Sequence, residues 1–158
     1  MSGVAITVDD LAGPEVAALL AEHLDEMRAV TPLESKHALD LDALRAPDVT
    51  FWTVWDDSND GRVLLGFGAL RELDPTHGEI KSMRTASAYQ GLGVGGALVR
   101  HVVAEARRRG YRRLSLETGS SEYFAPARRL YARHGFVPCA PFGDYREDRH
   151  SVHLTLAL

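Results

Sequence analysis

The chain has 158 residues, of which 45% are hydrophobic, and it carries a formal net charge of −4. This length and composition predict one compact domain over residues 1–158, and the acidic balance argues against a nucleic-acid partner. No stretch approaches 18 apolar residues, no leader-like segment opens the chain, and the single Cys139 excludes an internal disulfide framework. We therefore expect a cytoplasmic protein without a membrane partner.

Residue patterns and turn signals predict the elements of the N-terminal half. Pro14 is favoured in the first turn of a helix, and an amphipathic stretch follows it. The acidic run at residues 56–61 contains Asp, Asn and Gly, which typically form a turn between two strands. The expected elements are a strand at 4–8, helices at 14–27 and 38–45, and two hairpin strands at 51–55 and 63–73.

The C-terminal half contains a strand–loop–helix–strand unit. Residues 79–85 and 113–118 alternate between polar and apolar side chains, which indicates strands. Between them, apolar residues recur every four positions from Val94 to Ala106, so we expect an amphipathic helix that is capped at Gly110. Such a unit needs a right-handed crossover. The remaining expected elements are a short helix around Tyr131 and strands at 136–139 and 152–158.

Four glycines lie where this helix begins. Gly91, Gly93, Gly95 and Gly96 leave backbone N–H groups bare at the positive end of a helix dipole, which suits a phosphate. Three of them also spell G-x-G-x-x-G, and Glu117 lies near the spacing of a dinucleotide-binding fold. Only 41 residues follow Glu117, too few to complete a doubly wound sheet, and the chain has no G-x-x-x-x-G-K-[ST] motif. Both of these nucleotide-binding interpretations are therefore disfavoured.

Two motifs favour another phosphate-binding family. Residues 90–95, Gln-Gly-Leu-Gly-Val-Gly, resemble the Q/R-x-x-G-x-G/A signature of the GNAT superfamily of acyl-CoA-dependent N-acetyltransferases. Residues 127–136 resemble the later A-x-x-L-Y-x-x-x-G-F element of that family, and the resemblance covers residues 79–137. It implies the α+β GNAT fold, a mixed and mostly antiparallel sheet of about six to seven strands with helices on both faces. It also implies acetyl-CoA as the cofactor.

The resemblance assigns residues to the cofactor. In this family the strand before the glycine loop pairs through its backbone with the pantetheine arm, and a bulge there splays the strand from its parallel neighbour. That strand contains Arg84, whose side chain we expect to reach either a phosphate or solvent. The implied cofactor contacts are Met83, Arg84, Thr85, Gln90, Gly91, Leu92, Gly93, Val94, Gly95, Gly96, Thr118, Phe124 and Arg128.

Acetyl transfer needs a base for the amine, donors for the developing oxyanion and an acid for the departing thiolate. The resemblance assigns Tyr131 to protonation of the thiolate, and the alternative is a core tyrosine bonded to backbone. Glu79 stands eleven residues ahead of Gln90, a spacing at which relatives carry a catalytic glutamate. It is the candidate base, acting directly or through water, and the alternative is an exposed carboxylate at a strand end.

The acceptor walls in this family come from the first helices, the loop between them and the last hairpin. We expect a small-molecule primary amine that attacks the thioester directly in a ternary complex. The alternatives are a non-catalytic acyl-CoA-binding module and a protein or peptide N-acetyltransferase. The sequence leaves open a homodimer through the last strands. The implied acceptor contacts are Met27, Thr31, Glu34, His37, Trp52 and Tyr145, with simple packing as the alternative for His37 and Trp52.

Charge is distributed unevenly along the chain. Residues 84–133 contain ten arginines and three glutamates, a net of +7, whereas the whole chain carries −4. A basic half would suit the polyphosphate of coenzyme A and an acidic half would attract a cationic amine, the alternative being ordinary solvated faces. His150 and His153 project to opposite faces of an expected strand, so we expect no metal site.

Overall fold

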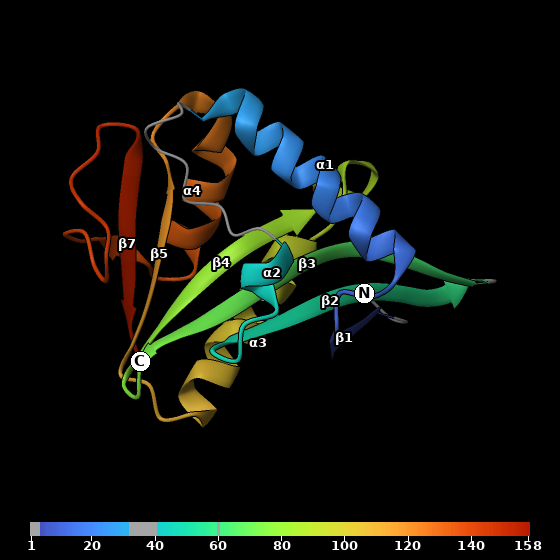
Figure 1. Cartoon of the computed structure of the whole chain (residues 1–158), viewed down its shortest axis with the longest axis horizontal. Coiled ribbons are helices and arrows are strands. Elements are labelled where there is room, and N and C mark those ends of the chain that lie inside the picture. The colour runs from blue at the N-terminus through green and yellow to red at the C-terminus, as the bar shows by residue number, and fades with distance from the viewer. Residues whose placement is uncertain (1–3, 32–40, 60) are drawn as a thin grey trace.

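The computed structural model describes residues 4–31, 41–59 and 61–158, and the strands in this part of the chain form one sheet (Figure 1). Its seven strands have the order β1-β2-β3-β4-β5-β7-β6, and β4 and β5 form the parallel pair in an otherwise antiparallel sheet. The expected mixed sheet is confirmed. The strands are β1 (Val4–Val8), β2 (Val49–Asn59), β3 (Gly61–Asp74), β4 (His77–Thr85), β5 (Arg113–Gly119), β6 (Val137–Pro138) and β7 (Ser151–Ala157).

Helices cover both faces of the sheet, as expected (Figure 1). On one face, Val16 and Leu44 bury apolar side chains against a core that includes Phe67. On the other face, Val102 packs in a second core with Leu116. This burial of one apolar stripe per helix is the main force that holds the three layers together. The helices are α1 (Pro14–Val30), α2 (Leu41–Leu44), α3 (Val94–Arg108) and α4 (Ala125–Arg133), with 3₁₀ turns η2 (Ser87–Tyr89) and η3 (Glu122–Phe124).

The element order is the expected one, and the differences lie at element ends. α1 continues to Val30 because the Thr31 N–H still donates to the Met27 carbonyl and completes the last turn. β6 is shorter than the expected strand at 136–139, because its pairing with β7 involves Val137 and Pro138. Part of the expected helix at 38–45 lies outside the described residues.

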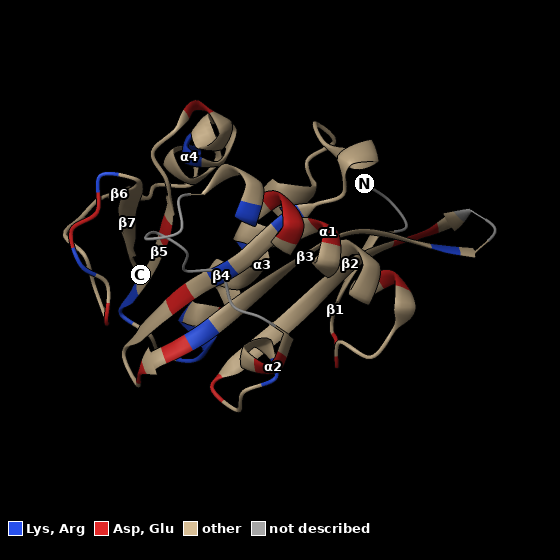
Figure 2. Ribbon diagram, turned by 45° about the horizontal axis from the view of Figure 1, so that its top comes forward, with Lys and Arg blue, Asp and Glu red and all other residues tan. Residues whose placement is uncertain are grey.

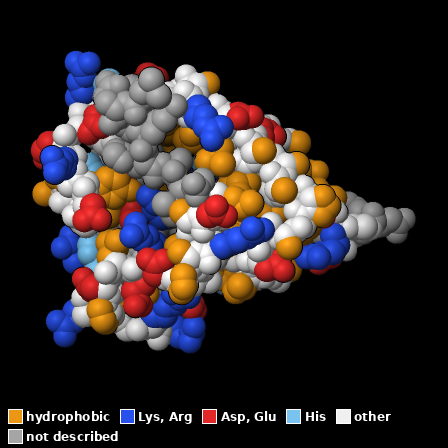
Figure 3. Space-filling model, viewed as in Figure 1, with side chains coloured by type: hydrophobic (Ala, Val, Ile, Leu, Met, Phe, Trp, Pro, Cys, Tyr) orange, Lys and Arg blue, Asp and Glu red, His pale blue; other side chains and the backbone are white. Residues whose placement is uncertain are grey.

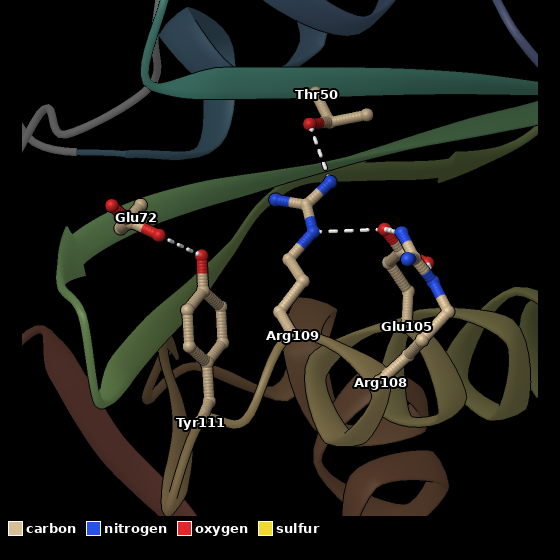
Figure 4. A network of polar contacts seen from close by, with 6 residues as sticks. All are labelled: Thr50, Glu72, Glu105, Arg108, Arg109 and Tyr111. Carbon is tan, nitrogen blue, oxygen red and sulfur yellow. Dashed lines mark hydrogen bonds and ion pairs between the residues drawn. The ribbon is translucent and has the colours of Figure 1, made fainter.

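A network of polar contacts ties the C-terminal end of α3 to the sheet (Figure 4). Arg109 Nε donates to Glu105 Oε2 at 2.8 Å, and its Nη2 donates to Thr50 Oγ1 at 2.8 Å. The Tyr111 hydroxyl donates to Glu72 Oε1 at 2.6 Å. These contacts join the end of α3 to β2 and β3, far from the glycine loop at its start.

β4 and β5 pair at one end and then separate. Their parallel register joins residues 77–80 to residues 113–116, and beyond it the two strands diverge (Figure 1). The register between β3 and β4 shifts between Phe67 and Ala69, and Ser82 on β4 has a φ of +50°. The expected bulge is therefore present in β4, and it bends the strand away from β5. The result is a wedge-shaped opening in the middle of the sheet.

Candidate active site

The opening between β4 and β5 leads into a cleft of about 1280 Å³. Its walls come from both strands, the glycine loop, the start of α3, α4 and the C-terminal half of α1. The structure thus brings most of the predicted site residues together. Those that line the cleft are Met27, Thr31, Met83, Arg84, Thr85, Gln90, Gly91, Gly93, Val94, Gly95, Gly96, Thr118, Phe124, Tyr131 and Tyr145.

The glycine loop adopts a conformation that favours glycine. Gly91 and Gly93 have φ values of +79° and +90°, although a Cβ at either position would meet nothing within 4 Å. Backbone strain, rather than lack of space, therefore selects glycine at these two positions. Gly93 is the N-cap of α3 and, within the described residues, forms no side-chain cap hydrogen bond. The N–H groups of the first turn of α3 consequently remain able to bind an anion.

Basic side chains line the same cleft as this loop. Arg100 comes from α3, and Arg129 and Arg133 come from one face of α4, four residues apart. Burial lowers the pKa of His134 beside them, and Arg100 and Arg133 lower it further, so this imidazole is neutral at pH 7. The guanidinium groups, with the uncapped helix, make this end of the cleft suitable for phosphates.

The charge separation along the sequence does not produce a face of one sign in Figure 3. Figure 2 shows acidic segments along α1 and basic segments on α4. On the face drawn in Figure 3, however, acidic and basic side chains of described residues lie next to one another. Arg28 and Arg71 form ion pairs with Asp25 and Asp48. The basic side chains that line the cleft come from α1, β4, α3 and α4, namely Arg28, Lys81, Arg84, Arg100, Arg129 and Arg133.

Tyr131 is buried and faces the cleft from α4. Its side chain is 6% exposed, and its ring packs edge-on against Phe136 at a centroid distance of 5.7 Å. Burial raises the pKa of the Tyr131 hydroxyl well above its ordinary value. The phenol therefore keeps its proton at neutral pH and is held in one orientation, as a proton donor to the cleft must be.

Glu79 is deeply buried, which contradicts its alternative interpretation as an exposed carboxylate at a strand end. Its side chain is 2% exposed. The Tyr145 hydroxyl donates to Glu79 Oε2 at 2.6 Å, and Lys81 Nζ lies 3.5 Å from the same oxygen. Lys81 Nζ also donates to the Tyr145 hydroxyl oxygen at 2.9 Å. Tyr145 and Lys81 line the cleft, whereas Glu79 lies behind them among the described residues.

Arg84 reaches neither phosphate nor solvent, so both expectations for its side chain are wrong. It is 7% exposed and points toward α1, where its Nη2 donates to Glu22 Oε1 at 2.9 Å. Its Nη1 lies 2.7 Å from Glu26 Oε2. The bulged β4 directs the Arg84 side chain to the face that α1 covers, and the two carboxylates compensate its buried charge.

Three other predictions are corrected by the structure. Trp52 is 3% exposed and belongs to the core, where its ring packs edge-on against His101 at 5.2 Å, so its role is packing. Leu92 is 60% exposed, and it lies outside the cleft walls of the described structure because its side chain points to solvent. Arg128 Nη1 donates to the carbonyls of Gly119 and Ser121 at 2.6 and 2.8 Å. It therefore shapes the loop after β5 instead of lining the cleft.

The remaining expectations concern two acceptor contacts, metal binding and membrane-spanning helices. Glu34 and His37 lie outside the described residues. In the part of the chain that the structure describes, no cluster of three or more His, Cys, Asp or Glu side chains is arranged to hold a metal ion. Of the helices described, none combines the length and the apolar character that a membrane crossing requires.

Sequence reasoning missed several cleft residues. Lys81 alternates with Glu79 along a strand, a spacing that places both side chains on one face and could have indicated their contact. Arg129 and Arg133 lie at helical spacing next to the L-Y motif, and this pattern could have indicated a basic wall. Tyr123 and Glu26 meet through the fold alone, since 97 residues separate them.

Comparison with known proteins agrees with this geometry. Residues 16–136 match the model of the acetyltransferase (GNAT) family. The chain is 51% identical over 153 residues to the uncharacterized N-acetyltransferase YsnE of Bacillus subtilis (strain 168), covering 97% of this chain and 99% of the relative. It is 34% identical over 137 residues to the IAA acetyltransferase of Azospirillum brasilense, covering 85% and 86%. A GNAT family acetyltransferase from Elizabethkingia anophelis, solved with acetyl-CoA bound, shares the fold with a TM-score of 0.67 at 20% identity over 100% of both chains.

Proposed function

Because this chain belongs to the GNAT family and is an N-acetyltransferase, we propose that it transfers an acetyl group from acetyl-CoA to the primary amine of a small molecule by direct attack in a ternary complex. One observation carries this proposal. The glycine loop, the uncapped start of α3 and the buried Tyr131 line a single cleft between two diverging strands. An anion site and a proton donor therefore face the same space.

The residues at the start of α3 fit the diphosphate of coenzyme A. The bare N–H groups after Gly93 and the guanidinium groups of Arg129 and Arg133 are donors to negatively charged oxygens. Acetyl-CoA, when bound, supplies the acetyl group as a thioester. Its complex with the Elizabethkingia anophelis fold relative supports the same use of the cleft here.

Tyr131 is the proposed acid. The raised pKa of its buried hydroxyl keeps the proton available at neutral pH, and Tyr131 is one of the residues that line the cleft. We assign it the protonation of the sulfur that leaves when the new amide bond forms. Glu79 is the proposed base, which receives the proton that the acceptor ammonium must lose before its nitrogen can attack.

A small cationic amine is the acceptor that the α1 side of the cleft favours. Met27 and Thr31 line this end, and Glu26 adds a carboxylate. Glu22 and Glu26 together place two negative charges beside the single positive charge of Arg84. This local excess of negative charge attracts an ammonium group. A non-catalytic acyl-CoA-binding module would need neither Tyr131 nor Glu79 in these positions.

The test is release of thiol from acetyl-CoA across a panel of primary amines, with peptides and IAA included. We expect turnover with a small amine and a loss of about 10-fold or more in kcat for Tyr131→Phe, with little change in the KM for acetyl-CoA. Tyr111→Phe is the matched control, because Tyr111 is similarly buried and lies outside the cleft walls described. Turnover with peptides alone would replace the small-molecule acceptor. Binding of acetyl-CoA without any turnover would favour the non-catalytic module.

A further inference from the structure

The buried carboxylate of Glu79 is separated from the cleft by one phenol. Tyr145 comes from the loop between β6 and β7, and its hydroxyl donates to Glu79 Oε2 at 2.6 Å. Tyr145 and Lys81 line the cleft, while the Glu79 side chain, 2% exposed, lies behind them. Among the described residues, a proton that moves from the cleft to Glu79 therefore meets Tyr145 or Lys81 first. Lys81 is a cation that donates hydrogen bonds, so the phenol is the group suited to receive a proton.

The surroundings of Tyr145 fix its ring. Phe142 and His153 pack edge-on against the ring at centroid distances of 5.1 and 5.2 Å. Lys81 Nζ donates to the hydroxyl oxygen at 2.9 Å, so the hydroxyl hydrogen is directed to Glu79. The result is a short chain of hydrogen bonds, from Lys81 to Tyr145 to Glu79, that begins on the cleft wall and ends in the interior.

We propose that Tyr145 is a proton relay between the acceptor nitrogen and Glu79, an inference that rests on the proposed function. The ammonium proton of the acceptor passes to the Tyr145 oxygen while the Tyr145 hydroxyl proton passes to Glu79 Oε2. The phenol is unchanged at the end, Glu79 becomes a neutral carboxylic acid, and the acceptor becomes a neutral amine. That amine then forms the bond to the acetyl carbon as the carbon–sulfur bond breaks.

The electrostatics suit a relay that never becomes a stable tyrosinate. Burial raises the pKa of the Tyr145 hydroxyl, and the negative charge of Glu79 raises it further. The phenol therefore always holds a proton to pass inward. Within the described residues, the charged and titratable groups that face this phenol include Glu79 and Lys81 from β4, Glu117 from β5, His153 from β7 and Arg71 from β3.

The test compares Tyr145→Phe, Glu79→Gln and the double variant with a matched pair elsewhere in the fold. Tyr111 donates to Glu72 Oε1 at the same 2.6 Å but outside the cleft walls described, so Tyr111→Phe and Glu72→Gln are the controls. The assay measures thiol release from acetyl-CoA with the best amine of the panel between pH 6 and pH 10. Thermal unfolding and calorimetric binding of coenzyme A verify that each variant is folded and binds.

We expect each single cleft variant to lose about 100-fold in kcat at low pH, with the KM for acetyl-CoA within about 2-fold of wild type. The double variant should be no more than about 3-fold slower than the slower single variant, because both residues serve one proton path. All three deficits should shrink as the pH approaches the pKa of the amine, since the acceptor then arrives already neutral. A purely structural role for Tyr145 would not produce this recovery at high pH.

Three results would overturn the relay. If the wild type is active and Tyr145→Phe has the same kcat as the wild type at every pH, Glu79 receives the proton by another path. A loss that is equal at all pH values and adds to that of Glu79→Gln would reduce Tyr145 to a packing residue. A wild type that binds coenzyme A but acetylates no amine would overturn the proposed function, and the relay with it. The last result is distinguished from the others because the control variants would be inactive too.

Discussion

The Tyr123 hydroxyl donates a hydrogen bond to the Glu26 carboxylate, and so joins η3 to the C-terminal half of α1. Glu26 also pairs with Arg84 on β4. All three residues line the cleft, and they come from three different elements of the fold. This contact holds α1 and η3, which lie on two walls of the cleft, at a fixed distance from each other.

Tyr123→Phe should lower stability in a pH-dependent manner. The hydrogen bond from Tyr123 is the first cause that holds the pKa of Glu26 below its ordinary value of 4.5, and Arg84 contributes next. A carboxylate with a lowered folded-state pKa adds stability above its unfolded-state pKa, and this is lost as the pH falls through the folded-state value. We expect a Tm lower by about 2–4 °C at pH 7, and a difference from wild type that narrows below pH 4.5.

Thermal unfolding of wild type and Tyr123→Phe from pH 7 to pH 3 measures this difference. Tyr89→Phe is the control. Tyr89, like Tyr123, lies in a 3₁₀ turn that follows a strand of the sheet, so this variant removes a hydroxyl group from a comparable position. An equal Tm deficit for Tyr123→Phe at all pH values would mean that the loss of stability does not come from the hydrogen bond to the ionised Glu26 carboxylate.

The sequence predicted the parts of this fold that local rules determine. The repeat of apolar residues and the glycines before it predict a helix that begins with bare backbone N–H groups, whatever the tertiary partners are. Gly93 indeed begins α3 with a φ of +90°, and Val94, Leu98 and Val102 are buried. The motif around Tyr131 likewise placed that residue on a short helix, where the structure has it.

The partners of the buried charges could not be predicted in this way. Arg84 meets Glu22 across 62 residues of sequence, and Glu79 meets Tyr145 across 66. Such contacts depend on how α1 and the loop between β6 and β7 fold back over β4. Trp52 was misassigned for a related reason, because alternation along β2 directs its side chain to the core beneath α3, where it meets His101.

Gly93→Ala should weaken coenzyme A binding through strain in the backbone. A Cβ at Gly93 meets nothing within 4 Å, so the cost comes from holding a side chain at a φ of +90°. We expect a loss of stability of about 1–2 kcal/mol and a Kd for coenzyme A that rises about 10-fold, as the loop relaxes away from its anion-binding shape. Calorimetric titration with coenzyme A measures this effect.

The control for Gly93→Ala is Gly13→Ala. Gly13 caps α1 with a φ of −75°, and a Cβ there also meets nothing within 4 Å. It should leave the Kd unchanged. If Gly93→Ala bound coenzyme A as tightly as Gly13→Ala, the left-handed turn would not be part of the anion site.

The paired substitution Arg129→Ala and Arg133→Ala should weaken coenzyme A binding in a salt-dependent manner. Both side chains line the same cleft as the glycine loop, and each substitution removes one positive charge from the wall that we assign to the phosphates. We expect a Kd about 10-fold higher at low salt, and a smaller difference at 0.5 M salt because mobile ions screen the remaining attraction. Arg107→Ala is the control, since Arg107 is an exposed arginine in the last turn of α3. Tyr131 lies on the same helix, so the kcat with saturating acetyl-CoA reports whether the two substitutions displace α4. We expect this kcat to stay near that of wild type. A large fall in kcat would mean that the two arginines position α4 instead of binding phosphate.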